Sequence, residues 1–359
     1  MYSFFRPLLF RLDPETAHRL TLQLMRIGGL QPMNGILRIL YSAPNKPVHA
    51  FGLDFKNAVG LAAGYDKDAV AMRGLAALGF GHIEVGTVTP LPQDGNPKPR
   101  IFRLVEDEAV INRLGFPGRG TEFVQGKLNP SLNPNWLERF IGFGPRRKKP
   151  FKRILNDVIL GVNIGKNKST SNEEAVFDYL ALLQNFAPSA DYLTINVSSP
   201  NTAGLRRLQE RDALEALLAH LHQQRLIEQT QLKRRLPLLV KIAPDLTDEE
   251  LDDAVDVVLR TRMDGIIATN TTLAREGLRS SYQTESGGLS GAPLRARSEA
   301  ILQKVVKRMN GQIPIISVGG IMSPDDAKRR LDMGATLVQI YTGLIYHGPG
   351  LANAIVRSL

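Results

Sequence analysis

Eight short apolar segments between residues 58 and 341 constrain the fold of this chain more than any other feature. Most are rich in Val and Ile and apolar at successive positions, which indicates strands buried on both faces of a parallel sheet. Helical stretches separate them, as is typical of α/β folds. An open doubly wound sheet also fits this alternation, but eight units over about 300 residues favour a closed (β/α)8 TIM barrel. The predicted strands are Ala58–Ala63, His82–Val88, Val158–Ile164, Tyr192–Val197, Leu238–Ile242, Gly265–Thr269, Ile313–Val318 and Thr336–Tyr341.

Two segments lie outside this pattern. We expect residues 1–45 to form an extension of two short amphipathic helices before a barrel domain of residues 46–359. One helix should begin at Asp13-Pro14-Glu15, where Asp13 caps it, and end at Gly28-Gly29. Exposed aromatics and arginines suit a bilayer surface, and packing against the barrel floor is the alternative that these residues leave open. An insertion at about 124–152, with a short helix near Trp136–Phe140 and a basic loop, should separate the second and third strands.

Composition excludes several classes of function. The chain has no cysteine, so it carries no disulfide, thiolate metal site, iron–sulfur cluster or cysteine nucleophile. The net charge is +10, but six basic residues lie in the run 146–153, and removing them leaves +4. No zinc-finger or aromatic RNA-binding signature accompanies that run, so we expect no nucleic-acid partner, and we expect no metal site. No apolar run reaches the ~20 residues of a spanning helix, and the amino terminus lacks a signal-peptide cleavage pattern.

Polar residues gather where the predicted strands end, which in a barrel is the catalytic face. Each has an ordinary explanation alone, since an Asn after a strand often caps a helix and a lone Lys is often solvated. Together they favour a site. Lys67 and Lys241 lie at the ends of apolar strands, where an unpaired ammonium is costly, so they should face an anion. Strand-terminal amides suit a flat ring with many hydrogen-bonding edges, and they are Asn163, Asn196, Asn201 and Asn270.

A phosphate site is expected after the last two strands, as in many barrels. Gly319-Gly320 allows close approach of backbone N–H groups, and Tyr341-Thr342 adds hydroxyl donors. The segment Gly287–Gly291 should be a flexible loop that closes over the same group. No Walker pattern or strand-linked G-x-G-x-x-G is present, which disfavours ATP and NAD(P). A phosphate joined to a hydrogen-bonding ring indicates FMN.

At these residues the chain resembles the class 2, quinone-linked dihydroorotate dehydrogenases. The resemblance runs from the amino-terminal helices to the carboxyl terminus and lapses only near 124–152. Its motifs are long and specific: Gly60-Leu61-Ala62-Ala63-Gly64-Tyr65-Asp66-Lys67, Gly86-Thr87-Val88-Thr89-Pro90, Ile111-Asn112-Arg113-Leu114-Gly115-Phe116, and Asn196 through Arg206.

The resemblance implies three sets of site residues. Ser199 would be the catalytic base, where class 1 relatives use cysteine, and Thr202 is a candidate to relay its proton. FMN would be held by Ala63, Gly64, Tyr65, Asp66, Lys67, Thr87, Asn163, Asn196, Lys241, Thr269, Gly291, Gly320, Tyr341 and Thr342. Dihydroorotate or orotate would be held by Lys67, Asn112, Arg113, Leu114, Gly115, Phe116, Asn196, Asn201, Asn270 and Thr271.

The resemblance also implies a partner and a location. His18, Arg103 and Tyr341 match positions that line a quinone tunnel, so residues 1–45 would meet an anionic membrane surface. We expect a monomer without an iron–sulfur partner subunit, bound peripherally (monotopic) to the cytoplasmic side of a bacterial inner membrane. Pro117-Gly118 departs from the asparagine pair usual in the family, which puts the shape of the substrate loop in doubt. The alternatives are an FMN barrel acting on another pyrimidine and a non-catalytic barrel that binds orotate or lipid.

Overall fold

The structure, a computed structural model, describes residues 2–129, 155 and 157–359. Its centre is a closed barrel of parallel strands in the order β3-β4-β7-β8-β9-β10-β12-β13, and β13 pairs back to β3 through Val338 and Val59. The predicted TIM barrel is therefore confirmed, and all eight predicted strands are present with ends within two residues of expectation. The strands are β3 Val59–Leu61, β4 His82–Val88, β7 Ile159–Ile164, β8 Tyr192–Asn196, β9 Leu238–Ile242, β10 Gly265–Ala268, β12 Ile315–Val318 and β13 Leu337–Ile340.

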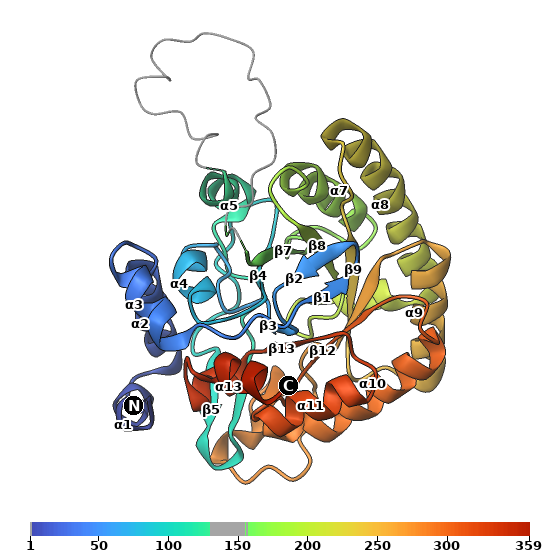
Figure 1. The fold of residues 1–359 in the computed structure, drawn as a ribbon. Helices are drawn as coiled ribbons and strands as arrows, with labels where there is room; N and C mark the ends of the chain where they lie inside the picture. The colour runs from blue at the N-terminus through green and yellow to red at the C-terminus, as the bar shows by residue number, and fades with distance from the viewer. Residues whose placement is uncertain (1, 130–154, 156) are drawn as a thin grey trace.

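Helices surround the barrel in a ring (Figure 1). Branched aliphatic side chains pack between strands and helices, and the larger hydrophobic core cluster lies there. Helix α9 is closed at its start by a capping box in which Thr247 and Glu250 satisfy each other's backbone N–H groups. The ring helices are α4 Met72–Ala76, α5 Gly120–Leu128, α7 Ala175–Phe186, α8 Arg211–Leu232, α9 Asp248–Arg260, α10 Arg295–Met309, α11 Pro324–Asp332, α12 Thr342–His347 and α13 Leu351–Ser358.

The barrel floor is closed by a hairpin that the sequence did not predict. Its strands are β1 Val48–Ala50 and β2 Leu53–Phe55, which lie across the barrel in Figure 1. Phe55 is fully buried, and its ring meets the edge of the His82 ring at 5.4 Å. This apolar plug leaves the carboxyl ends of the strands as the open end of the barrel.

A three-stranded antiparallel sheet was also not predicted. It pairs β5 Ile101–Leu104 with β6 Ala109–Asn112, and β6 with β11 Gly288–Gly291. The expectation that Gly287–Gly291 is a flexible loop is therefore wrong, because Gly288–Gly291 forms ladder hydrogen bonds with β6. The sheet joins segments that are far apart in sequence and brings Asn112 and Ser290 to the same cavity.

The amino-terminal extension contains three helices, not two: α1 Tyr2–Arg11, α2 Pro14–Gly28 and α3 Met33–Tyr41. The predicted cap is confirmed, since Asp13 accepts a hydrogen bond from the Thr16 N–H at 2.9 Å. Helix α2 packs closely on α4, where a Cβ on Gly74 would lie 1.9 Å from the Met25 carbonyl oxygen.

Several polar contacts fasten the extension to the barrel, among them an ion pair and a tyrosine hydrogen bond. Glu15 forms a two-point ion pair with the buried Arg100 guanidinium, at 2.9 and 3.2 Å. The Tyr2 hydroxyl donates to the Ile345 carbonyl in α12 at 2.5 Å. None of the described helices is long and apolar enough to cross a bilayer.

The expected insertion at about 124–152 overlaps a helix at its first residues. Residues 124–128 belong to helix α5, whose Val124 and Leu128 are buried against the barrel. The helix expected near Trp136–Phe140 and the basic run 146–153 lie outside the described residues.

Candidate active site

A cavity at the carboxyl ends of the strands encloses about 970 Å³ of empty space, part of it open to solvent. Its size suits a cofactor together with a small substrate. Residues from every barrel strand except β7, or from the loop that follows the strand, line it. Of the residues predicted from sequence, it is lined by Ala63, Gly64, Lys67, Thr87, Asn112, Leu114, Gly115, Phe116, Asn196, Ser199, Asn201, Lys241, Thr269, Asn270, Thr271, Gly291, Gly320, Tyr341 and Thr342.

Four of the residues predicted to hold FMN or substrate do not line this cavity. Asp66 turns away and accepts the N–H groups of residues 70 and 71 at 2.9 and 2.8 Å, so it shapes the loop after β3. The Arg113 guanidinium lies over the Phe102 ring and pairs with Glu285. Tyr65 packs toward helix α2, and Asn163 lies behind the lining residues.

The amides form one connected network at the cavity floor. Asn196 donates to Thr87 Oγ1 at 2.8 Å and to Asn163 Oδ1 at 3.1 Å, and Thr87 donates to the same Asn163 oxygen. Asn270 donates to Asn196 Oδ1 at 3.3 Å. These bonds fix the amide planes before any ligand enters, so the floor is preorganised for a planar group.

A second amide pair lies at the side of the cavity formed by β6. Asn201 Nδ2 donates to Asn112 Oδ1 at 3.1 Å. Asn96 donates from one amide nitrogen to the carbonyl oxygens of Arg113 and Asn201, both at 3.0 Å. The loop after β6 is therefore held to the loop after β8. The Pro117-Gly118 departure leaves this loop anchored, because Gly118 exchanges two backbone hydrogen bonds with Gln93.

Both predicted lysines line the cavity, where Lys241 is buried and Lys67 is partly buried. Burial lowers the pKa of Lys67 to about 8, opposed by the Asp68 and Glu15 carboxylates. Its Nζ donates to the Gly64 carbonyl oxygen at 2.7 Å, which holds the ammonium in place. Burial also lowers the pKa of Lys241, and the Glu84 carboxylate opposes this. Two cations enclosed in one cavity favour a ligand that carries or develops negative charge.

Glu84 was missed by the sequence analysis. It lies inside the barrel on β4 and is fully buried. Its carboxylate accepts hydrogen bonds from Asn163, Tyr192, Thr194 and Gln339 at 2.8 to 3.1 Å. A charged residue at the centre of the apolar run His82–Val88 was the available signal, because such a residue is buried only for a specific reason.

Other lining residues were also missed. Gln339 and Ser290 are polar, and Gln339 Oε1 is buried without a hydrogen-bond partner among the described residues. Gly319, named in the phosphate prediction, lines the cavity as well. The remaining ones, mostly apolar, are Ala62, Leu294, Val318, Ile321, Met322, Ile340 and Gly343.

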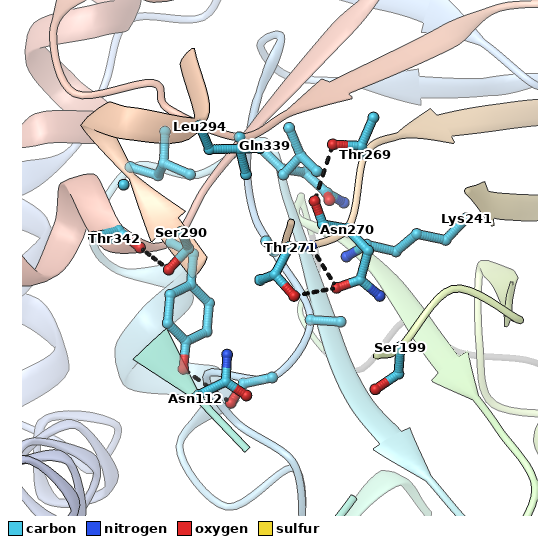
Figure 2. A pocket seen from close by; sticks show the side chains of 18 of the residues that line it. Asn112, Ser199, Lys241, Thr269, Asn270, Thr271, Ser290, Leu294, Gln339 and Thr342 are labelled. Carbon is cyan, nitrogen blue, oxygen red and sulfur yellow. Dashed lines mark hydrogen bonds between the residues drawn. The ribbon is translucent and has the colours of Figure 1, made fainter. Parts of the chain in front are cut away.

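Ser199 projects into the cavity from the loop after β8 and lies on the same side as Lys241 in Figure 2. Its Oγ accepts the Asn201 N–H at 3.2 Å, which leaves its own O–H free to turn. Thr202 Oγ1 is buried nearby in sequence without a partner in the part of the chain that the structure describes. The Ser199 hydroxyl, which is a weak base, therefore shares its loop with a second buried hydroxyl, that of Thr202.

The opposite side of the cavity in Figure 2 carries Ser290 and Thr342, whose hydroxyls are 2.8 Å apart. Gly320 and Gly291 also line the cavity, in positive-φ conformations, at +71° and +99°. A Cβ on Gly320 would lie 2.4 Å from the Arg295 Cα, and one on Gly291 would lie 2.3 Å from the Glu108 carbonyl. Only glycine fits at these two positions.

A row of aromatic rings leads from the extension to the cavity. The His18 ring meets Tyr65 at 5.1 Å, and Tyr65 meets Tyr341, which lines the cavity, at 5.7 Å. Burial, with the Lys67 ammonium nearby, lowers the pKa of His18 to about 3, so this ring is neutral. Arg103, the third predicted tunnel residue, lies over the Phe10 ring of α1, 4.2 Å from its centroid.

The extension exposes many large apolar side chains. Phe4 and Ile39 are 82% and 84% exposed, and the set also comprises Phe5, Leu8, Leu12, Leu20, Leu24, Ile27, Leu30, Met33, Ile36 and Leu40. So many large exposed apolar residues on three short helices mark an interaction surface. Among the described residues, no group of three His, Asp or Glu side chains could hold a metal ion.

A parallel barrel with an amide-lined, doubly cationic cavity at its carboxyl end defines an α/β-barrel enzyme for a planar, anionic ligand. The chain belongs to the dihydroorotate dehydrogenase family, whose model matches residues 46–359. It is 46% identical over 359 residues to a dihydroorotate dehydrogenase (quinone) of Idiomarina loihiensis, covering all of both chains. It is 48% identical to the Chromobacterium violaceum protein of the same name, covering all of this chain and 97% of that one.

Solved structures agree. The dihydroorotate dehydrogenase of Eimeria tenella in complex with ferulenol superimposes with a TM-score of 0.82 at 41% identity, covering 96% of this chain and 90% of that one. Its ligand-free form gives the same TM-score at 43% identity, covering 96% and 94%.

Proposed function

We propose that this chain oxidises (S)-dihydroorotate to orotate in de novo pyrimidine biosynthesis and passes the electrons through FMN to a membrane quinone. One observation carries the proposal. The cavity joins Ser199, Lys67 and Lys241 to a preorganised amide network, in a chain that is matched over its full length by relatives named dihydroorotate dehydrogenase (quinone).

The cavity fits FMN on three counts. The glycine rim with Ser290 and Thr342 offers N–H and O–H donors to a phosphate. Gln339 Oε1, a buried acceptor without a partner among the described residues, suits a ring N–H. Lys241 suits the carbonyl edge of a ring that gains negative charge. We assign the cofactor to Gly291, Gly320, Thr342, Lys241 and Thr87, with Asn163 acting from behind. Bound FMN would accept a hydride from the substrate and release electrons singly or in pairs.

The substrate side is assigned to the amides and to Lys67. Asn201 Nδ2 lies 3.1 Å from Asn112 Oδ1, and Asn270 lines the same cavity from the end of β10. The three amides can therefore orient a pyrimidine ring. Lys67 supplies an ammonium for the substrate carboxylate. Ser199 takes the proton from substrate C5 while hydride leaves C6, and Thr202 is our candidate for passing that proton on.

The extension, residues 1–45, is assigned to a membrane surface and to quinone access. The exposed apolar face of α1 to α3 carries Arg6, Arg11, Arg19 and Arg26 beside it, which suits anionic lipid headgroups. The His18–Tyr65–Tyr341 row gives a contiguous route from this surface to the cavity. We infer a peripheral protein on the cytoplasmic side of a bacterial inner membrane, and a monomer.

The test is anaerobic reduction of the flavin. Dihydroorotate is added without oxygen to purified protein loaded with FMN, and the visible flavin absorbance is followed. We expect rapid bleaching, then recovery of the yellow colour when a soluble quinone is added. A flavin that stays oxidised with dihydroorotate but bleaches with dithionite would refute the substrate assignment. Bleaching without recovery would refute the quinone assignment.

A further inference from the structure

The proposed chemistry leaves one charged group unused: the Glu84 carboxylate, fully buried inside the barrel and outside the cavity lining. Burying a carboxylate is costly unless hydrogen bonds and an opposite charge compensate it. Glu84 has the hydrogen bonds, because Oε1 accepts from Asn163 at 2.8 Å and Oε2 accepts from Tyr192, Thr194 and Gln339. A neutral glutamine would keep three of these four hydrogen bonds, so the hydrogen bonds alone do not explain the charge.

Glutamine would satisfy most of the same partners, because its amide nitrogen has two N–H groups for the three partners of Glu84 Oε2. The Gln339 side chain now donates to Glu84 with Nε2, while its Oε1 lacks a partner among the described residues. If the Gln339 amide turned over, that oxygen would accept from the amide nitrogen that Glu84→Gln introduces. The hydroxyls of Tyr192 and Thr194 can accept as well as donate. The Asn163 contact to the other Glu84 oxygen would be unchanged, so Glu84→Gln removes the charge at the cost of one of the four hydrogen bonds.

The charge has a matching cation close by. Asn163, which donates to Glu84, accepts from Asn196, and Asn196 is paired in register with Lys241 on β9. The carboxylate of Glu84 is the charged neighbour that opposes the burial-driven fall in the Lys241 pKa. The other titratable groups near Glu84 stay neutral: burial raises the pKa of Tyr192 well above its usual value and lowers that of His82 to about 3.

We propose that Glu84 is a positioning residue that acts through Lys241: its buried charge keeps Lys241 an ammonium, and so keeps the cavity attractive to the negative charge that develops on a reduced flavin. The second half of this inference rests on the proposed function, and the first half does not. Without the carboxylate, burial would act on Lys241 unopposed, and the ammonium would release its proton at lower pH.

The test measures Lys241 directly. Full-length protein is labelled with 13C at lysine Cε, and the chemical shifts are followed against pH with and without FMN. The signal absent from a Lys241→Met variant identifies Lys241. We expect its midpoint to fall by about one pH unit or more in Glu84→Gln, a tenfold change in its ionisation constant. Thr194→Val is the matched control, because it removes one hydrogen bond to Glu84 and keeps the charge, so its midpoint should stay at the wild-type value.

A second readout tests the link to the flavin. The midpoint potential of bound FMN is measured against pH, and the break in slope that Lys241→Met abolishes should move with the Lys241 midpoint in Glu84→Gln.

An unchanged Lys241 midpoint in Glu84→Gln, in protein that folds and binds FMN, overturns the proposal. If Glu84→Gln does not fold, Glu84→Asp is used in its place. Its shorter side chain moves the carboxylate away from Lys241, so the Lys241 midpoint should fall by a smaller amount. An unchanged midpoint in Glu84→Asp would refute the pairing. The titration without FMN needs no flavin chemistry. If the Lys241 midpoint falls in Glu84→Gln but dihydroorotate does not bleach the flavin of the wild-type protein, the proposed function is refuted and the pairing of Glu84 with Lys241 stands.

Discussion

Replacing Lys67 with methionine should weaken orotate binding strongly while leaving the fold intact. The Lys67 ammonium lines the cavity, is partly buried, and is held by the Gly64 carbonyl at 2.7 Å, so it meets the ligand carboxylate partly desolvated and already oriented. Truncating one partner of such a pair costs about 2–5 kcal/mol, which corresponds to a Kd about 30-fold to several-thousand-fold higher. Methionine keeps the length of the side chain and removes only the charge.

The pH dependence gives a sharper test of the same residue. Because the pKa of Lys67 is about 8, the ammonium is present at pH 7 and largely lost at pH 9. Only the charged form binds the anion well, so the apparent Kd should be near its minimum at pH 7 and rise about tenfold by pH 9. Calorimetric titration of orotate into the FMN-loaded protein at successive pH values measures this.

Two variants control for ionisation of the ligand itself. Lys67→Arg stays charged throughout, so the part of the pH dependence that is due to Lys67 should disappear while binding persists. Lys67→Met should lose both that dependence and the affinity. If the wild-type protein and Lys67→Met show the same slope between pH 7 and pH 9, Lys67 is not the anion-binding group.

Three further predictions concern the base, the core and the membrane surface. Ser199→Ala should still bind FMN and orotate but reduce flavin about 10²–10⁴-fold more slowly in stopped flow, and near-normal reduction would remove Ser199 from the mechanism. Burial lowers the pKa of His82 to about 3, so the contribution of neutral His82 to the free energy of unfolding is full above about pH 6.5 and is lost as the pH falls toward 3. At pH 5 this loss is about 2 kcal/mol. Urea unfolding at successive pH values measures it, and the His82→Leu variant should not show this loss. The double variant Phe4→Ser/Ile39→Ser should bind anionic vesicles at least about tenfold more weakly in a sedimentation assay, because both side chains are exposed. Dihydroorotate should still bleach its flavin, because neither side chain lines the cavity. Unchanged vesicle binding would count against the assigned surface.

The barrel was predictable because each of its strands carries its own signal. Runs such as Val158–Ile164 are apolar on both faces wherever they lie, so burial in a parallel sheet can be recognised locally. Strand β11 has no such signal, since Gly-Leu-Ser-Gly is typical of a turn. It becomes a strand only because β6, which lies far away in sequence, offers it a ladder.

The candidate site was predictable to the same extent. Strand ends point to one mouth, so residues such as Asn196 and Lys241 could be placed together without knowing any contact. Side-chain direction could not be predicted: Arg113 shares a motif with Asn112 yet leaves the cavity for Glu285. Glu84 was hidden for a different reason, since its partners come from β7, β8 and β13 and meet only when the barrel closes.

The ion pair between Glu15 and Arg100 bears on how this protein can be shortened. Arg100 also donates to the carbonyl oxygens of Asp94 and Asn96, and Asn96 in turn holds the loop that carries Asn201. A fragment that begins at residue 46 would lose Glu15 and leave a buried guanidinium without its carboxylate, next to the loop that positions the substrate amides. The extension and the barrel should therefore melt together as one cooperative unit. A fragment that begins at Asp13 keeps both the ion pair and the helix cap, and it is the better choice for separating lipid binding from catalysis.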